Sequence, residues 1–427
     1  TSSVYQIKLD KNNLIIQNKY DIKYIKQILV RKNDLIFVSF LDGIYIINNN
    51  IFHLYEKNGL ISNIINYAIV SSNNEIWIAT DKGVNRILPN NKILQYTTKE
   101  GLSSNIITYI YEDPGKNLWF ASLGNNVTLF KPTDFYAFKN KGITNHNVFA
   151  VLLHNNYLLA GTYGYGIEVF DNKGKFIKAI KLPGDKENII NSIVKLKNEI
   201  WVSTNYGIYR LDNNLNFIEH LKVPKSNLVG SIYYSNYYNK VFLATYFSLY
   251  EYDLNKKYFA LIKDSLSIFN IVGDKLGNIY LSTENKGIFR YNKGLITHLD
   301  FERKITSTTT LFIDRNNNLW FCAENEGLCK YDTKNKLHIV SDKNGLFNNL
   351  FMAIEEVGDY LWFSSNQGIF RCKKSEIEDF FAGKRNYITS ILYNHKNGIP
   401  NSEFNGGYNF ASAKSNDNTL FFANADG

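Results

Sequence analysis

The sequence predicts an all-β protein built as a β-propeller, and three observations support this. Short runs rich in Ile, Tyr, Phe and Trp alternate with turns rich in Gly, Asn and Asp, a pattern typical of short antiparallel strands. One of these runs recurs with a large residue at a fixed slot, and successive slots lie 38–42 residues apart, except for a last spacing of 59. The slot is filled by Ile36, Trp77, Trp119, Leu159, Trp201, Phe242, Tyr280, Trp320, Trp362 and Phe421. About ten units of roughly 40 residues indicate four-stranded propeller blades.

The segment 101–130 shows how one unit is built. An apolar first strand at 106–111 is followed by a turn containing Asp113 and Gly115, and the second strand at 118–121 carries the slot residue. A second turn leads to the third strand at 127–130. We expect the first strand, the most apolar, to lie nearest the propeller axis. We expect each slot ring to fill the gap between neighbouring sheets, which stabilises the fold by about 2–3 kcal/mol for each buried ring.

The two ends of the chain match parts of a unit. Residues 1–19 read as a third and a fourth strand, and the chain stops just after a second strand at 420–423. A blade cut at either place exposes unpaired strand edges, which natural proteins avoid. We therefore expect this chain to be a piece of a longer protein.

Unit nine carries an insertion that explains the spacing of 59. Ser375 and Glu378 form a capping-box pattern, and the apolar stripe of Ile377, Phe380 and Phe381 predicts a short helix at 375–382. A strand at 387–393 follows it.

Composition excludes several function classes. The formal net charge is +9, but the Lys and Arg residues are spread among Asn-rich turns, which indicates a solvated surface and no bound nucleic acid. The sequence contains no run of 18 apolar residues, so it predicts no transmembrane helix. The three cysteines lack metal-binding spacing, and we expect buried free thiols, with a bridge between Cys322 and Cys329 as the alternative.

The residue pattern offers little catalytic chemistry. His53, His220, His298 and His338 all fall in fourth strands, on the outer side of a blade, and no HxH or HExxH motif occurs. Asp-rich turns such as 314–318 lack the terminal Glu of a calcium loop, and the glycines of 161–166 lack the strand-to-helix context of a phosphate loop. We expect no catalytic residue, no metal and no cofactor.

A binding surface is the remaining prediction. The turns between second and third strands lie on one face of a propeller, and there aromatic side chains alternate with amides and carboxylates. The predicted ligand-binding residues are Tyr163, Tyr165, Tyr206, Tyr246, Phe247, Asn205, Glu284, Asn285, Glu324 and Asn325. Such surfaces suit sugar rings, whose C–H faces stack on aromatics and whose hydroxyls need fixed partners. The alternative is that these aromatics pack between blades, above all Tyr206.

The chain resembles the two-component regulator propeller family. The resemblance rests on GL-x-x-N-x-I near the start of units, on D-x-x-G-x-LW-[IF]-[AGS]-T, and on the Gly turn that follows, and it covers essentially the whole chain. The stretch NGIPNSEFNGG and the final LFF-x-N-x-x-G are similar to the last blade before a triple-tyrosine domain in such sensors.

The resemblance implies a domain organisation and a function. Family members commonly carry seven-bladed propellers in tandem in the periplasm, before a transmembrane helix and an output module such as a histidine kinase or a diguanylate cyclase. We therefore predict that residues 1–180 end a first propeller and that residues 181–427 form a second one, with the boundary in the loop 172–188. The implied function is non-catalytic sensing of an oligosaccharide or another polar ligand, with a homodimer as a candidate signalling unit. The alternatives are a propeller scaffold for protein partners and a propeller lyase or hydrolase.

Overall fold

The computed structural model describes residues 3–10, 13–48, 50–114, 116–124, 127–130, 135, 137–138, 147–172, 174–184, 188–226, 228–324, 326–399, 401–406, 408 and 410–425. Two compact units are present, unit 1 (Thr1–Thr133) and unit 2 (Asp134–Gly427). Both are built from antiparallel sheets whose strands follow one another in sequence order, as predicted for propeller blades. No helix among the described residues is both long and apolar enough to cross a membrane.

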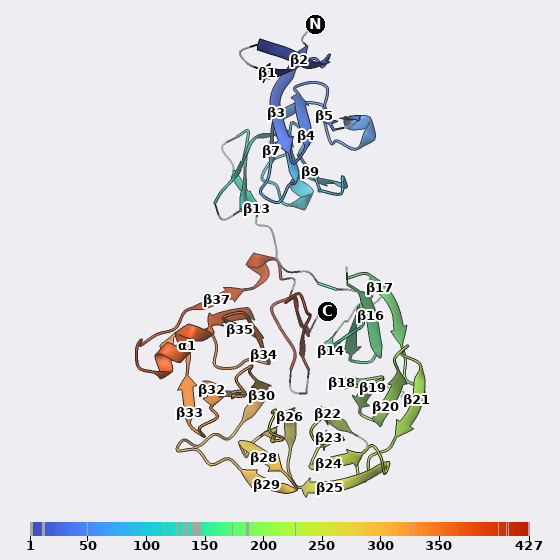
Figure 1. Ribbon diagram of the computed structural model, residues 1–427, viewed down its shortest axis with the longest axis vertical. Helices are drawn as coiled ribbons and strands as arrows, with labels where there is room; N and C mark the ends of the chain where they lie inside the picture. The colour runs from blue at the N-terminus through green and yellow to red at the C-terminus, as the bar shows by residue number, and fades with distance from the viewer. Residues whose placement is uncertain are drawn as a thin grey trace. The chain divides into compact units, whose positions relative to one another are not determined.

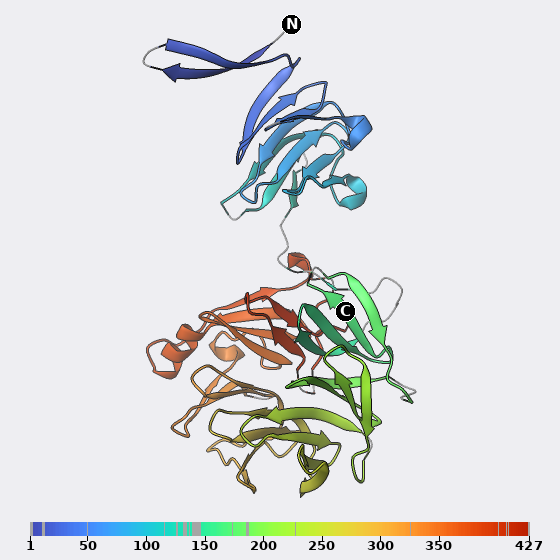
Figure 2. The same ribbon diagram turned by 45° about the vertical axis from the view of Figure 1, so that its right-hand side comes forward.

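Within the described residues, unit 1 contains four sheets that follow one another in sequence order, coloured blue to cyan in Figure 2. The first is the hairpin of β1 (Val4–Asp10) and β2 (Asn13–Tyr20), which confirms the third and fourth strands expected at the N-terminal end. Two four-stranded blades follow, and then a sheet with three described strands. Their strands are β3 (Ile25–Arg31), β4 (Asp34–Ser39), β5 (Ile44–Ile47) and β6 (Ile51–Leu54); β7 (Ile65–Val70), β8 (Ile76–Thr80), β9 (Val84–Ile87) and β10 (Ile93–Tyr96); and β11 (Ile107–Glu112), β12 (Leu118–Ser122) and β13 (Val127–Phe130).

In the part of the chain that the structure describes, unit 2 is a ring of seven sheets, seen nearly end-on in Figure 1. The first strand of each sheet contacts the first strand of the next, and the ring closes where β38 contacts both β34 and β14. Six sheets have four strands, and within the described residues the seventh has two.

The strands of unit 2 run outward from the axis in sequence order. They are β14 (Val148–His154), β15 (Tyr157–Thr162), β16 (Ile167–Asp171) and β17 (Phe176–Ile180); β18 (Ile190–Leu196), β19 (Glu199–Thr204), β20 (Gly207–Asp212) and β21 (Phe217–Leu221); β22 (Val229–Ser235), β23 (Lys240–Thr245), β24 (Ser248–Asp253) and β25 (Tyr258–Asp264); β26 (Ile268–Gly273), β27 (Ile279–Thr283), β28 (Ile288–Asn292) and β29 (Leu295–His298); β30 (Thr308–Ile313), β31 (Leu319–Ala323), β32 (Gly327–Tyr331) and β33 (Leu337–Val340); β34 (Ala353–Val357), β35 (Tyr360–Ser365), β36 (Gly368–Lys373) and β37 (Ser390–Tyr393); and β38 (Ser412–Lys414) with β39 (Leu420–Phe422).

The boundary between the units falls earlier than the sequence predicted. Compact unit 2 begins at Asp134, not at residue 181, so the predicted division into 1–180 and 181–427 is wrong. The segment predicted to hold the boundary contains β17, which is the outer strand of the first sheet of unit 2. Leu182 and Ile190, on either side of that segment's end, are buried in the core between the first two blades.

The recurring Gly-Leu motif closes a short 3₁₀ helix. The helices before a Gly-Leu pair are η1 (Glu56–Asn58), η2 (Thr98–Glu100) and η3 (Asp342–Asn344), and η4 (His395–Asn397) precedes Gly398 and Ile399 in the same way. Each is followed by a glycine with positive φ, as at Gly101 (102°) and Gly345 (96°), a conformation that costs glycine little. The next residue is buried, as Leu102 and Leu346 show, so the motif turns the chain back into the wedge between blades.

Several slot rings fill the gaps between sheets, as predicted. Trp77, Trp201 and Trp320 are at most 1% exposed. Trp77 packs against Phe120 of the next blade with ring centroids 5.7 Å apart, and Trp201 packs against Tyr252 of the next blade at 5.5 Å. Trp119, in the last sheet of unit 1, is 38% exposed.

Each buried indole N–H has a carboxylate acceptor. Trp77 Nε1 donates to Glu75 Oε2 at 3.1 Å, and Trp201 Nε1 donates to Glu199 Oε2 at 3.0 Å. An arginine of the third strand belongs to each group. At Trp201 this arginine is Arg210, which pairs with Glu199 at 2.8 Å and lies over the indole ring at 5.4 Å. A buried N–H without an acceptor would cost about 1–3 kcal/mol, so these groups let an indole occupy the wedge.

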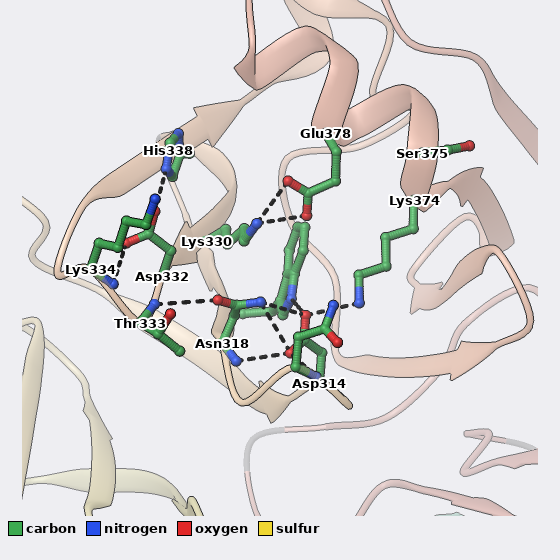
Figure 3. Close-up of polar contacts among 12 residues, drawn as sticks. Asp314, Asn318, Lys330, Asp332, Thr333, Lys334, His338, Lys374, Ser375 and Glu378 are labelled. Atoms are coloured by element: carbon green, nitrogen blue, oxygen red, sulfur yellow. Dashed lines mark hydrogen bonds and ion pairs between the residues drawn. The ribbon is translucent and has the colours of Figure 1, made fainter.

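At Trp320 the cations come partly from the inserted helix, α1 (Lys374–Phe381), which confirms the helix expected at 375–382. Figure 3 shows Lys374 reaching Asp314, the acceptor of the Trp320 N–H. Lys374 Nζ lies 2.8 Å from both Asp314 Oδ2 and Glu356 Oε1, and all three side chains are at most 10% exposed. Glu378 of the same helix binds Lys330, whose Nζ lies 2.6 Å from Glu378 Oε1.

Replacing Lys374 with Met should destabilise unit 2 by about 3–5 kcal/mol, because Asp314 and Glu356 would stay buried without their cation. Lys384→Met is the matched control, since Lys384 is 71% exposed beside Asp379 and its loss should cost less than about 1 kcal/mol. Urea denaturation at pH 7 measures both. Equal losses would contradict the assignment of Lys374 to a buried ion-pair group.

The same group predicts acid sensitivity. Burial raises the pKa of Asp314, but hydrogen bonds from Lys374, Trp320 and Asn318 outweigh burial and hold the pKa below its ordinary 3.8. The stabilisation is therefore present above the unfolded-state pKa and is lost as pH falls through the lower folded-state pKa. The stability difference between the wild type and Lys374→Met should shrink below about pH 4. A difference that stays constant from pH 7 to pH 3 would contradict this.

Candidate functional site

The turns between second and third strands form one edge of the ring, which we call the rim: residues 163–166, 205–206, 246–247, 284–286, 324, 326 and 366–367. Most of these turns begin after a Thr or Ser whose hydroxyl donates back across the turn. Thr162 Oγ1 donates to the carbonyl of Gly166 at 2.9 Å, and Thr283 Oγ1 donates to that of Gly287 at 2.7 Å. The small hydroxyl residue that ends the strand-two motif therefore fixes the turn and presents the intervening side chains to solvent.

Histidines of the fourth strands brace the same turns. His220 Nε2 lies 2.8 Å from the carbonyl of Tyr206, and His298 Nε2 lies 2.9 Å from that of Lys286. A carbonyl can only accept, so each Nε2 carries the proton. His53 makes the equivalent contact with the carbonyl of Asp42 in unit 1. All four fourth-strand histidines lie where the sequence placed them, and these three support turns.

Three of the five predicted rim aromatics are exposed. Tyr163 is 53% exposed, Tyr246 56% and Phe247 59%. The rings of Tyr246 and Phe247 meet edge to face with centroids 4.4 Å apart, an arrangement that holds both in place.

The other two predicted aromatics are not free platforms. Tyr206 packs against the core between the first two blades, which was the alternative considered for it. Tyr165 is half-buried, and its backbone N–H donates to Thr162 Oγ1 at 3.1 Å.

The predicted polar residues also differ in their exposure to solvent. Glu284, Asn285 and Glu324 are exposed on the rim. Asn205 is half-buried, and its side-chain oxygen accepts a hydrogen bond from Asn191 Nδ2 at 3.1 Å. This oxygen is therefore already bonded within the protein. Asn325 lies outside the described residues.

A small pocket of about 80 Å³ brings two of the predicted residues together. Tyr246 and Glu284 line it from neighbouring blades, and Thr245 and Ser267 add hydroxyls. Tyr408 forms another wall, and burial raises the pKa of its phenol. An aromatic ring, a carboxylate, a phenol and hydroxyls within one hollow can hold a hydroxyl-rich ligand by stacking and by hydrogen bonds.

Sequence reasoning missed Tyr408, because it lies in the irregular segment that leads into the last sheet. One feature of the sequence could have indicated that another segment approaches this strand. Gly230 occupies the interior of a first strand, and a glycine there marks a close approach of other atoms. A Cβ on Gly230 would lie 2.4 Å from a ring carbon of Tyr408.

The opposite end of the ring holds a larger cavity of about 770 Å³ at the turns between first and second strands. Lys414 and Glu356 both line this cavity, and Lys414 Nζ donates a hydrogen bond to the carbonyl of Glu356 at 2.7 Å. The neighbouring Glu355 is half-buried and accepts a hydrogen bond from Ser412 Oγ at 2.8 Å. Within the described part of the chain, no three His, Cys, Asp or Glu side chains come together as a metal site would require.

The described cysteines lie in the core of the ring. Cys322, Cys329 and Cys372 are free and buried, so the bridge considered between Cys322 and Cys329 does not form. Burial raises the pKa of the Cys322 thiol to about 11.

Comparison with known proteins supports the fold and the repeat. Residues 101–124 match the family described as two component regulator propeller, which confirms the resemblance seen in the repeat pattern. No curated protein matches the sequence.

Two solved structures share the fold over nearly the whole chain. The extracellular domain of the putative hybrid two component system BT3049 from B. thetaiotaomicron superposes with a TM-score of 0.67 at 20% identity, over 98% of this chain and 57% of that one. The extracellular domain of the putative one component system BT4673 from the same organism gives a TM-score of 0.55 at 15% identity, over 99% of this chain and 73% of that one. This chain therefore spans a little over half of the first of these domains.

Replacing Glu355 with Gln should stabilise unit 2 near neutral pH. Burial raises the pKa of Glu355 above its ordinary 4.5, so the unfolded state ionises first and stability falls as pH rises between the two pKa values. Gln removes that loss and still accepts from Ser412, so the gain should be present at pH 7 and absent near pH 4. Glu284→Gln, at an exposed position, should change stability at neither pH. A gain of equal size at both pH values for Glu355→Gln would contradict the burial argument.

Proposed function

We propose that this chain is the extracytoplasmic sensing region of a two-component-type receptor and that its rim binds an oligosaccharide. The shared fold with extracellular domains of such systems and the two component regulator propeller repeat support the receptor assignment. We place the chain in the periplasm, where it would report on glycans that enter from outside the cell.

The observation that carries the ligand proposal is the grouping of Tyr246, Phe247 and Glu284 on neighbouring turns. Two exposed rings held edge to face offer an apolar platform, and the Glu284 carboxylate lies beside it across a pocket. Sugar rings need an apolar surface next to hydrogen-bond acceptors, so the grouping fits a saccharide better than a purely apolar ligand.

The rim is suited to binding because its turns are already fixed. Hydroxyl bonds across the turns and histidine contacts beneath them hold the backbone in place before any ligand arrives. A preformed site loses little conformational entropy on binding, which raises affinity without further contacts. Ligand binding would then favour one arrangement of the receptor over another and so bias a downstream output module.

A thermal-shift screen with neutral and acidic oligosaccharides of plant and microbial origin tests the proposal. A ligand that binds only the folded state stabilises it by about 2.7 kcal/mol at a concentration of 100 Kd, so a specific saccharide should raise Tm measurably. No rise with any oligosaccharide would contradict the ligand class.

Rim variants locate the site once a binding saccharide is found. Tyr246→Ala and Glu284→Gln should each weaken binding at least about tenfold, or about 1.4 kcal/mol, by isothermal titration. Tyr258→Ala is the matched control, because Tyr258 is 64% exposed on the outer strand β25, away from the rim. Saccharide binding that survives both rim changes would move the site elsewhere.

A further inference from the structure

The end of the ring opposite the rim holds the cavity of about 770 Å³, which takes no part in the proposed saccharide binding. It lies where the first strands of five sheets end, β22, β26, β30, β34 and β38, and each of these sheets contributes to its lining. Figure 1 shows the first strands of the sheets around the centre of the ring. Cavities of about 300–1,000 Å³ are typical of sites for small ligands.

Three cationic side chains from three different sheets line this cavity. Lys275 lies in the turn after β26, Arg315 in the turn after β30 and Lys414 at the end of β38. Lys275 and Lys414 are exposed, and the Arg315 side chain is 59% exposed. Within the described part of the chain, the Lys275 ammonium makes no hydrogen bond or ion pair, and Arg315 Nε lies 3.8 Å from its nearest carboxylate oxygen, on Glu356. Most N–H donors of these cations therefore face open space.

The carboxylates of the cavity wall are already bonded within the protein. Asp274 accepts two backbone N–H groups of its own turn, at 2.9 and 2.8 Å. Asp314 and Glu356 share Lys374, whose Nζ lies 2.8 Å from each, and their side chains are at most 6% exposed. Figure 3 shows Lys374 reaching Asp314. Glu355, the next acid along β34, bonds to a serine of β38. The accessible charge of the cavity is therefore cationic.

Contacts between successive blades hold these cations in place. The backbone N–H of Lys275 donates to Asn317 Oδ1 at 3.0 Å, and that of Arg315 donates to Glu356 Oε2 at 3.2 Å. Lys414 Nζ donates to the carbonyl of Glu356 at 2.7 Å. Because the two turns and the end of β38 are fixed before a ligand arrives, binding costs little conformational entropy.

Two tyrosines of the sheet that begins with β22 form an aromatic wall of the cavity. They pack on glycines of the next sheet, since a Cβ on Gly273 would lie 2.4 Å from the Tyr233 hydroxyl oxygen and one on Gly277 would lie 2.7 Å from a Tyr237 ring carbon. The Tyr237 side chain is 54% exposed. Burial and the nearby Asp274 carboxylate raise the pKa of Tyr233, so its phenol stays protonated. This wall offers a ring face and an O–H donor.

We propose that this cavity is a second binding site, which takes an organic anion with two or more carboxylate groups. The Arg315 guanidinium can bind one carboxylate through two parallel N–H groups, and Lys275 and Lys414 supply point charges for another. The exposed ring of Tyr237 can cover the carbon body of the ligand. An organic acid and an acidic oligosaccharide share this chemistry. The site needs no contribution from the rim, which lies at the other end of the ring.

Isothermal titration of the full chain with citrate and with trigalacturonate tests the proposal. At least one of the two should bind more tightly than acetate at the same ionic strength, and its affinity should fall as KCl is raised, because salt screens exposed charges. Binding of citrate assigns the site to organic acids, and binding of trigalacturonate alone assigns it to acidic saccharides. If neither probe binds more tightly than acetate, the proposal is overturned.

Variants place the bound anion. Lys275→Gln and Lys414→Gln should each weaken binding of that probe at least about tenfold, the usual effect of losing a charge-assisted hydrogen bond. Lys275→Gln should leave Tm unchanged, because the ammonium it removes makes no contact within the described residues. Lys256→Gln is the matched control, since Lys256 is exposed in the turn after β24 and does not line the cavity.

Two results of this series would overturn the site. An equal loss of binding in Lys256→Gln would mean that the probe responds to the overall charge of the protein and not to the cavity. Loss of binding in the rim variant Tyr246→Ala, with binding kept in Lys275→Gln, would place the anion on the rim. Failure of the rim to bind any saccharide leaves these predictions for the cavity unchanged, so the two proposals fail separately.

Discussion

The ring depends on filling the wedge that opens between neighbouring blades as they radiate from the axis. An aromatic ring in the second strand fills most of this wedge, and the indole needs an acceptor for its N–H once water is excluded. Glu199 with Arg210 and Asp314 with Lys374 satisfy that need at Trp201 and Trp320. Among the described residues, Trp201 is buried between two four-stranded sheets, and Trp362 is half-buried where the next sheet has two described strands. Trp119, in the last described sheet of unit 1, is exposed.

The same repeat that builds the core also builds the rim. The Thr that ends a second strand closes the turn, and a fourth-strand His supports the turn carbonyl, as His220 does beneath Tyr206. Because these contacts recur from blade to blade, the side chains between them are free to vary without loss of the fold. Tyr246, Phe247 and Glu284 are such side chains, so a structural repeat can present different side chains on the rim at each turn.

Much of the fold could be predicted from the sequence, because the strand pattern and the slot spacing repeat. The helix at 374–381 and the histidines of the fourth strands lie where they were expected. The unit boundary was wrong because outer strands such as β17 are largely exposed and weakly patterned, so their flanks resemble a linker. Of the candidate site, three of the five predicted aromatics are exposed on the rim, and their role in binding stays a prediction. The packing of Tyr206 and the arrival of Tyr408 from a distant segment depend on ring closure, which local patterns do not encode.

A double-mutant cycle on Glu199 and Arg210 tests the role of the wedge most directly. The account predicts that changing the two residues to Gln and Met gives a coupling of about 1–3 kcal/mol in urea denaturation, because the pair holds Trp201 inside the core. The pair of Arg210 with Glu219, which lies further out and is more exposed, should couple by less than about 1 kcal/mol. Equal coupling in the two cycles would contradict the claim that the acid and the cation act through the buried indole.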